Sequence, residues 1–173
     1  MSRGSDNRRM STETIEALYG AFARLDGRAM QACYADDAVF SDPVFELQGR
    51  TQIGGMWRML CDAASQHGAD VWRIETQGIK TLGPGASQGQ AHWEAWYRFS
   101  ATGRDVHNVI DAIFTFDANR RILSHRDRFD FWRWSRQALG LPGTLLGWTP
   151  MLRAKVQAKA RRNLDAYLAK HAI

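Results

Sequence analysis

His125 and Asp127 are two ionisable side chains that lie two residues apart in a strand-like segment, residues 121–132. Side chains alternate between the two faces of a strand, so one face carries both of them between Leu123 and Phe129. A histidine and a carboxylate on one face can share a proton, a water molecule or a polar group of a substrate. Either this face lines a pocket, or the strand lies at a sheet edge where neither face is buried.

Asp42 and Asp111 are two further carboxylates that the sequence sets beside apolar residues. Asp42 lies near the end of a short strand, residues 38–43, which a proline closes. Asp111 lies among aliphatic residues in the middle of a strand, residues 106–116, where an acid must find a partner or stay protonated. Carboxylates at close range cannot all ionise cheaply. We therefore expect at least one acid of the group to hold a proton or to pair with the histidine, as proton-transfer chemistry requires.

The elements that position these residues are predicted to be helices first and strands later. Apolar residues at three- and four-residue spacing predict helices over residues 12–25 and 51–64, with a short helix between them. Alternating patterns bounded by turn residues predict strands over 71–81, 92–100, 106–116 and 121–132. This order predicts an α+β fold with helices on one face of a curved antiparallel sheet. Such a sheet encloses a cone whose mouth suits a small molecule, which favours the pocket over the sheet edge.

Composition and charge bound the class of protein. The chain has 173 residues and a formal net charge of +5, but much of the positive excess lies near its two ends. No base-stacking or groove-reading motif accompanies these charges, so we expect no nucleic-acid partner. The chain has no apolar run of the roughly 18 residues that a membrane span needs, and it starts without a signal-peptide core. We expect a cytoplasmic protein in which Cys33 and Cys61 are buried free thiols, without a metal site.

Three parts are predicted along the chain: a disordered leader over residues 1–11, one domain over 12–135 and a helical extension over 136–173. The extension starts as an apolar loop rich in Gly and Pro and continues as a helix with a basic face, residues 151–170. We expect this helix to pack on the domain or across a dimer, with Trp148 and its neighbouring leucines covering apolar surface. A lid over the cone, or contact with a membrane surface, is the less favoured interpretation.

Several motifs occur in a characteristic order: Tyr34–Pro43, Gly49-Arg50, Val106–Asp111 followed by two phenylalanines, Arg121-Ile122 and Arg126–Asp130. Together they resemble the nuclear transport factor 2-like superfamily, which includes ketosteroid isomerases, limonene-epoxide hydrolases and SnoaL-type polyketide cyclases. The resemblance covers residues 12–135. It implies a cone-shaped α+β barrel, with a curved antiparallel sheet wrapped around N-terminal helices.

Ketosteroid isomerases supply one set of implied roles. Their general base is the Asp of an Asp-Pro step, which resembles Asp42, and their second, protonated acid resembles Asp111. Their third group is a Tyr on the first helix. An ungapped count from Asp42 reaches Leu18, with Tyr19 at the next position.

Limonene-epoxide hydrolases supply a second set of implied roles. Their water-holding Asp resembles Asp127, and His125 stands where that family has Trp. The family's other two water ligands, a Tyr and an Asn on the first strand, fall at Phe40 and Asp42, so one ligand is lost and the other becomes an acid. An Arg-x-Asp relay falls near His92-x-Glu94 after a shift of one residue.

The leading hypothesis is an isomerase or cyclase that transfers protons on a small hydrophobic carbonyl compound. Asp42 or Asp127 would abstract a proton, and protonated Asp111 or Tyr19 would stabilise the oxygen. Epoxide-hydrolase-like water activation and a non-catalytic ligand-binding or dimerisation module are the alternatives. We expect a homodimer without a cofactor. The predicted catalytic residues are Asp42, Asp111, His125 and Asp127, and the predicted ligand-binding residues are Tyr19, Phe22, Phe40, Trp57, His107, Val109 and Phe129. Which face of the 92–100 strand points inward is left open.

Overall fold

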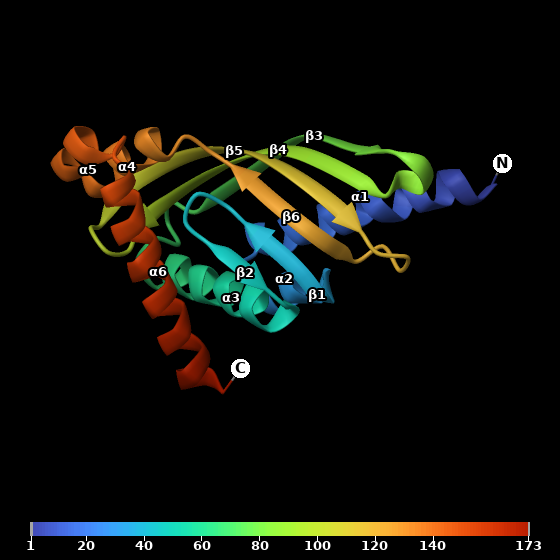
Figure 1. Cartoon of the computed structure of the whole chain (residues 1–173), viewed down its shortest axis with the longest axis horizontal. Helices are drawn as coiled ribbons and strands as arrows, with labels where there is room; N and C mark the ends of the chain where they lie inside the picture. Colours follow the sequence, from blue (N-terminus) through green and yellow to red (C-terminus); the bar gives the residue numbers. More distant parts are fainter. Residues whose placement is uncertain (1, 173) are drawn as a thin grey trace.

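The computed structural model describes the backbone of residues 2–172 and the side chains of residues 6–172. Six strands form one curved, unclosed sheet in the order β2-β1-β6-β5-β4-β3 (Figure 1). The strands are β1 (Tyr34–Ser41), β2 (Glu46–Gln48), β3 (Arg73–Leu82), β4 (Gln88–Phe99), β5 (Arg104–Phe116) and β6 (Ile122–Arg128), with a short 3-10 turn η1 (Pro84–Ala86) before β4. The α+β cone that the sequence predicts is confirmed.

One pair of strands departs from the antiparallel prediction. β1 runs parallel to β6, whereas every other neighbouring pair is antiparallel. Parallel neighbours need a long connection between them, and here that connection contains the helix α3 and the four other strands of the sheet. The parallel pair brings β1 beside the strand that carries His125 and Asp127.

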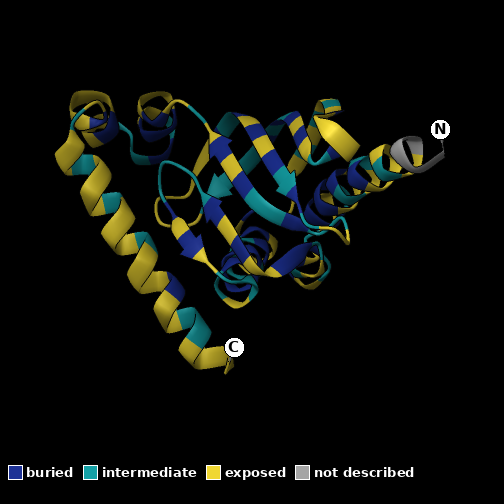
Figure 2. Cartoon of the chain, turned by 45° about the vertical axis from the view of Figure 1, so that its right-hand side comes forward, coloured by how far each residue is buried: buried dark blue, intermediate teal, exposed yellow. Residues whose placement is uncertain are grey.

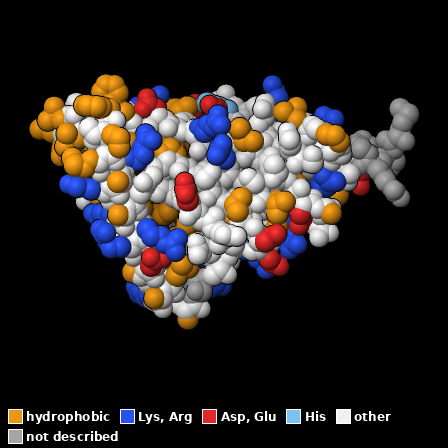
Figure 3. Space-filling model, in the orientation of Figure 1, with side chains coloured by type: hydrophobic (Ala, Val, Ile, Leu, Met, Phe, Trp, Pro, Cys, Tyr) orange, Lys and Arg blue, Asp and Glu red, His pale blue; other side chains and the backbone are white. Residues whose placement is uncertain are grey.

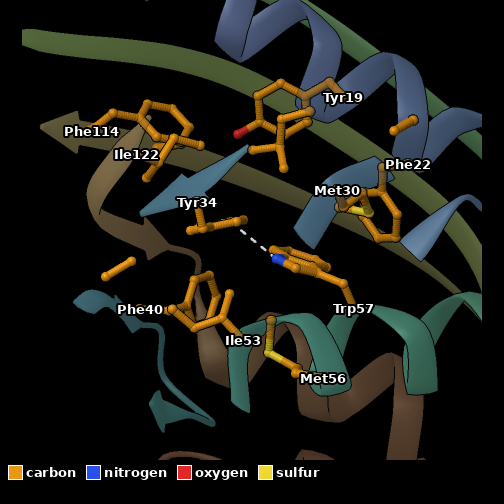
Figure 4. Packing of buried hydrophobic residues seen from close by; sticks show 14 of the residues in the cluster. Tyr19, Phe22, Met30, Tyr34, Phe40, Ile53, Met56, Trp57, Phe114 and Ile122 are labelled. Carbon is orange, nitrogen blue, oxygen red and sulfur yellow. Dashed lines mark hydrogen bonds between the residues drawn. The ribbon is translucent and has the colours of Figure 1, made fainter. Parts of the chain in front are cut away.

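Three helices pack against the concave face of the sheet: α1 (Ser2–Ala23), α2 (Gly27–Ala32) and α3 (Arg50–His67). Figure 4 shows how side chains from these helices and from the sheet meet in one core around Tyr34 and Trp57. Ile15, Leu18 and Phe22 of α1 are buried in it, as their spacing predicts. Full burial of each large apolar side chain contributes about 1.5–3 kcal/mol, so this core fixes the helices on the sheet.

The segment predicted as a disordered leader is helical. α1 begins at Ser2 and continues without a break through residue 11. Ser11 is fully buried, and its Oγ donates a hydrogen bond to the carbonyl of Ala86, at 2.9 Å. Ser11 therefore anchors the middle of a helix to η1 and does not cap a helix start.

The strand predicted over residues 121–132 ends earlier, at Arg128. Asp130 caps the next helix, α4 (Phe131–Leu139), by accepting a hydrogen bond from the amide of Arg133, at 3.0 Å. A register shift also lies near the start of β6, where Phe116 pairs with Ile122 and Thr115 with Ser124. Because this shift leaves Leu123 as an extra residue, Ile122 is the side chain that is fully buried there.

The extension consists of α4, the short helix α5 (Leu141–Leu146) and the long helix α6 (Pro150–His171). α6 crosses beside α3, as the warm-coloured helix of Figure 1 shows. Leu164 is its one buried residue (Figure 2), and the Tyr167 hydroxyl donates to Asp62 at 2.5 Å. The helix therefore packs on the domain. Trp148, Leu145 and Leu146 are exposed, so the prediction that they cover apolar surface does not hold within the single chain.

No helix among residues 2–172 is both long enough and apolar enough to cross a membrane.

Candidate functional site

The register of β4 and β5 decides which of their residues face the cone. His92 pairs with Asp111 and Trp93 pairs with Ile110. Ile110 and Trp93 are buried, so the face that carries them points inward. Alternation then places Ala95 on the inner face and Glu94 on the outer face. The choice between the two faces of this strand, which the sequence leaves open, is settled in favour of Trp93 and its partners.

Three predicted site residues lie on the outer face. Asp111, His107 and Val109 share the odd-numbered positions of β5 and point away from the cone. The carboxyl side chain of Asp111 is 75% exposed. The structure therefore does not bring Asp111, His107 or Val109 into the cavity with the other predicted site residues. Of the aliphatic neighbours of Asp111, Ile110 and Ala112 belong to the opposite, inner face, whereas Ile113 shares the outer face with it, and sequence adjacency alone does not show this.

The outer residues form side-chain hydrogen bonds with one another. His92 Nδ1 lies 2.8 Å from Asp111 Oδ1, and His107 Nε2 lies 2.5 Å from Glu94 Oε2. Trp96 stacks on His107 with ring centroids 4.4 Å apart. The possible hydrolase relay at His92-x-Glu94 is therefore outside the cone.

His125 and Asp127 form a buried pair at the inner wall. Their residues are only 1% and 4% exposed, and His125 Nε2 lies 2.9 Å from Asp127 Oδ1. On the other side of the ring, Nδ1 lies 2.7 Å from the hydroxyl of Tyr34. Trp57 Nε1 donates to the same hydroxyl at 3.0 Å, the bond drawn in Figure 4. Four side chains from β1, α3 and β6 thus form one chain of hydrogen bonds.

The donor groups determine the direction in which this chain of hydrogen bonds runs. An indole N–H can only donate, so the Tyr34 oxygen accepts from Trp57. Burial raises the pKa of Tyr34 well above its usual range, so the phenol keeps its proton. That single proton points to His125 Nδ1, which must then be an acceptor. The proton of the neutral imidazole is therefore on Nε2, where it is donated to the carboxylate of Asp127.

Asp127 is the end of this chain and faces a cavity of about 390 Å³. Trp93 Nε1 also reaches its Oδ1, at 3.4 Å. Both of these hydrogen bonds end on Oδ1, so Oδ2 is the oxygen that remains to meet a ligand. A carboxylate that accepts two N–H groups at the edge of an apolar cavity is placed to act as a base.

Asp42 shares this cavity with Asp127. Ser41 pairs with Arg126 across the parallel strands, and the two acids are the next residues of their chains. Asp42 Oδ1 accepts hydrogen bonds from the amides of Val44 and Phe45, at 2.6 and 2.5 Å. Burial raises the pKa of Asp42 to about 7, the two backbone hydrogen bonds oppose this, and the nearby charge of Asp127 adds to it. Near neutral pH this carboxyl group holds a proton part of the time.

Tyr19 is buried between α1 and the sheet and does not line the cavity. Its hydroxyl has no hydrogen bond of ordinary geometry within the described residues, although its ring lies beside that of Trp93, at 5.4 Å. Burial, and then the charge of Asp127, raise its pKa well above the usual range. The phenol therefore stays protonated near the inner acid without reaching the cavity surface.

The predicted aromatic wall is present. Phe22, Phe40, Trp57 and Phe129 all line the cavity. His125 lies behind Asp127 and does not line it. The walls are mostly apolar, which suits a hydrophobic small molecule.

Several wall and support residues were missed from the sequence. Tyr34 was recognised only as part of a motif, although it holds the proton that orients His125. Asn108 lines the cavity from the inner face of β5, and Tyr97 lines it while accepting a hydrogen bond from Trp134 Nε1, at 2.8 Å. The shared parity of Asn108 and Ile110 is the signal that could have identified the inner face. No sequence signal shows that Trp134 meets Tyr97.

The C-terminal extension completes the cavity. Trp134 and Leu139 of α4, and Val156 and Ala160 of α6, are part of the wall. The extension therefore closes part of the mouth of the cone in addition to packing on α3.

Clusters of three or more His, Cys, Asp or Glu side chains that could hold a metal ion do not occur within the described part of the chain.

Comparison with known proteins agrees with this architecture. A family model described as a SnoaL-like domain matches residues 15–125. No curated protein shows significant similarity to the chain.

Solved structures share the fold at low identity. A protein with a ketosteroid isomerase-like fold from Catenulispora acidiphila, in complex with trimethylamine, is 18% identical, with 80% of this chain and 98% of that chain covered and a TM-score of 0.61. An LEH-like epoxide hydrolase of M. tuberculosis is 18% identical, with 84% and 94% covered and a TM-score of 0.57. The epoxide hydrolase/cyclase-like enzyme SalBIII, which has a role in pyran ring formation in the polyether salinomycin, is 16% identical, with 70% and 91% covered and a TM-score of 0.59. At these identities the likeness concerns the fold alone.

Proposed function

The chain belongs to the SnoaL-like family, and from that premise we propose that it is a cofactor-independent isomerase or cyclase acting on a small hydrophobic carbonyl compound. The observation that carries the proposal is the directed chain from Trp57 through Tyr34 and His125 to Asp127. It ends on a carboxylate at the wall of an apolar cavity. Such a chain of hydrogen bonds holds the carboxylate in a fixed orientation, which proton abstraction requires.

Asp127 is the proposed base. Its free oxygen removes a proton from the carbon next to the carbonyl group of the ligand, and the electron pair of the broken C–H bond moves toward the carbonyl oxygen. The N–H groups of His125 and Trp93 remain on Oδ1 and hold the carboxyl group in place. Transfer of the proton back to another carbon completes an isomerisation. Alternatively, the enolate carbon attacks a second carbonyl carbon of the same ligand and forms a ring, while the π electrons of that carbonyl move to its oxygen, which takes the proton held by Asp127.

Asp42 is the proposed acid. Its raised pKa, about 7, leaves it partly protonated at neutral pH, so it can donate to the oxygen that becomes negative. Two carboxyl groups in one cavity, one that accepts two side-chain N–H groups and one whose pKa is raised by burial, suit a division into base and acid roles. Asp42 therefore takes the part that the sequence assigned to Asp111.

The decisive experiment compares three single variants, Asp127→Asn, Asp42→Asn and Asp111→Asn. The substrates are hydrophobic β,γ-unsaturated ketones, whose conversion to the conjugated form is followed by ultraviolet absorbance, with proton exchange in D2O followed by NMR. We expect Asp127→Asn to lower kcat/KM by about 10³-fold and Asp42→Asn by about 10²-fold. Asp111→Asn is the matched control, because its carboxyl is exposed on the outer face, and it should stay within about twofold.

A protein that exchanges no substrate proton, but binds such ketones equally well in all three variants, would be a ligand-binding module and not an enzyme. An equal loss of kcat/KM in Asp111→Asn and Asp127→Asn would also contradict the proposal, since an acid on the outer face would then matter as much as the acid at the cavity.

Epoxide opening is the second candidate function. It is favoured by the same free oxygen of Asp127, which could hold a water molecule while Asp42 protonates the epoxide oxygen. The fold is shared with an LEH-like epoxide hydrolase. Diol formation from hydrophobic cyclic epoxides in ¹⁸O-labelled water distinguishes the two functions, since only water activation incorporates the label.

A further inference from the structure

The extension has an unusual charge pattern. From Phe131 to Leu164 the sequence contains seven Lys and Arg residues and no Asp or Glu. Two of these cations, on the helices before and after α5, lie over aromatic rings: Arg136 over Trp132 at 4.9 Å and Arg153 over Phe131 at 5.0 Å. The segment from Phe131 to Leu164 therefore carries positive charge that no Asp or Glu of the same segment balances.

The short helix α5 is turned with its apolar side chains outward. Its inner side consists of glycines: a Cβ at Gly143 would overlap the carbonyl group of Ser135, and one at Gly147 would overlap the Ser135 side chain. Ser135 is fully buried, and its Oγ donates to the carbonyl groups of Trp132 and Gly143. Because only glycines fit against α4, the leucines of α5 can only point away from the domain.

The result is an exposed apolar tip at the end of the molecule opposite the N-terminus (Figures 1 and 3). Its members are 41–77% exposed: Leu141, Leu145, Leu146, Trp148 and Met151. The indole N–H of Trp148 donates to the carbonyl of Leu145, at 3.2 Å, so its one polar group is already satisfied. Figure 3 shows orange apolar side chains gathered at this tip, with blue basic side chains beside and below them.

We propose that the apolar tip docks on the surface of an anionic lipid bilayer. Leu and Trp side chains enter the interface between head groups and acyl chains, and the surrounding Lys and Arg residues contact the anionic head groups. A second copy of the chain is a poorer occupant, because two such tips face to face would bring together like charges with no acids between them. The proposal does not depend on the reaction in the cavity.

Vesicle sedimentation of the full chain tests this docking. The probes are phosphatidylcholine vesicles, and the same vesicles with about one third phosphatidylglycerol. We expect binding to the anionic vesicles only, weakening as salt is raised, because the head-group contacts are screened. The double variant Leu145→Gln with Trp148→Gln should lower the partition coefficient by about tenfold or more, since it removes two large apolar groups.

Leu82→Gln is the matched control, because Leu82 is also exposed, at 47%, but lies at the end of β3. Its binding should equal that of the unchanged chain, and all variants should keep the same thermal midpoint. The exchange Lys155→Glu should weaken binding to anionic vesicles. Absence of binding to anionic vesicles, or binding that the double variant leaves intact, overturns the proposal. A dimer in sedimentation velocity that the double variant dissociates, without vesicle binding, would assign the tip to a second copy and overturn it as well.

Discussion

The two faces of the sheet carry the same kinds of residues in different surroundings. On the outer face, His92 and Asp111 lie 2.8 Å apart with side chains that are 38% and 75% exposed. On the inner face, His125 and Asp127 lie 2.9 Å apart and are almost completely buried. Distance therefore does not distinguish the two pairs. Burial does, together with the partners that surround each pair.

The surroundings decide what each pair can do. The outer pair is open to water, which screens its interaction and can replace either partner's hydrogen bond. The inner pair is shielded, and Tyr34 and Trp57 occupy the far side of the imidazole ring, which fixes its tautomer. Only the inner pair therefore presents a carboxylate with a defined orientation to a cavity. A histidine beside an acid can therefore serve as a functional site when two further residues determine which ring nitrogen carries its proton.

Replacing each histidine by alanine should give the largest difference in stability between the inner and the outer pair. In His125→Ala, the buried Asp127 loses its strongest partner and a cavity opens in the core, so we expect a loss of about 3–5 kcal/mol in the free energy of unfolding. His92→Ala should change it by less than about 0.5 kcal/mol. Urea unfolding followed by circular dichroism measures both. Equal losses would mean that burial does not separate the two pairs.

Tyr34→Phe tests the surroundings of the inner pair, because it removes the hydroxyl that bonds to His125 and leaves the pair itself unchanged. It removes one oxygen and leaves Trp57 Nε1 and His125 Nδ1 without their partner, at a cost of about 1–3 kcal/mol. The histidine also loses the bond that fixes its tautomer, so kcat should fall with little change in KM. Tyr167→Phe is the control, because its hydroxyl bonds to Asp62 on the surface, and it should cost less than about 1 kcal/mol. The claim about the tautomer fails if ¹⁵N NMR of the unchanged chain shows the proton of His125 on Nδ1.

The smallest effect is a pH dependence of stability that comes from Asp42. The pKa of Asp42 in the folded protein, about 7, lies above its ordinary value of 3.8, so the folded state holds this proton more tightly than the unfolded chain does. Its contribution to stability is complete below pH 3.8 and is lost as the pH rises through 7. Asp42→Asn keeps the oxygen that accepts from Val44 and Phe45 but cannot ionise.

The thermal midpoint of Asp42→Asn, relative to that of the unchanged chain, should therefore rise by about a few degrees between pH 5 and pH 8. Asp111→Asn should show no such trend. In the enzyme, the activity that depends on Asp42 as an acid should decline above pH 7, and the variant should lack this decline. A flat difference in thermal midpoint over this range would place the pKa of Asp42 near its ordinary value.

Local patterns were sufficient for part of the site. Alternation along β6 predicted that His125 and Asp127 face inward, and the short strand before a proline predicted that Asp42 does so. The same reasoning failed at Asp111, because aliphatic neighbours in sequence lie on both faces of a strand. The extension was also only half predicted: the helix was expected, but the outward turn of its leucines depends on how closely Gly143 and Gly147 approach α4.

The sequence by itself determined the order of helices and strands, the family and the presence of an inward-facing histidine and acid on one strand, because these follow from periodicities and motifs that are local in the chain. Only the tertiary structure decided which acids share the cavity and which proton His125 carries. These depend on the parallel pairing of β1 with β6 and on Tyr34, Trp57 and Trp93, which lie 23 or more residues from their hydrogen-bond partners. Such contacts are set by the register and curvature of the sheet, and no local pattern of residues records them.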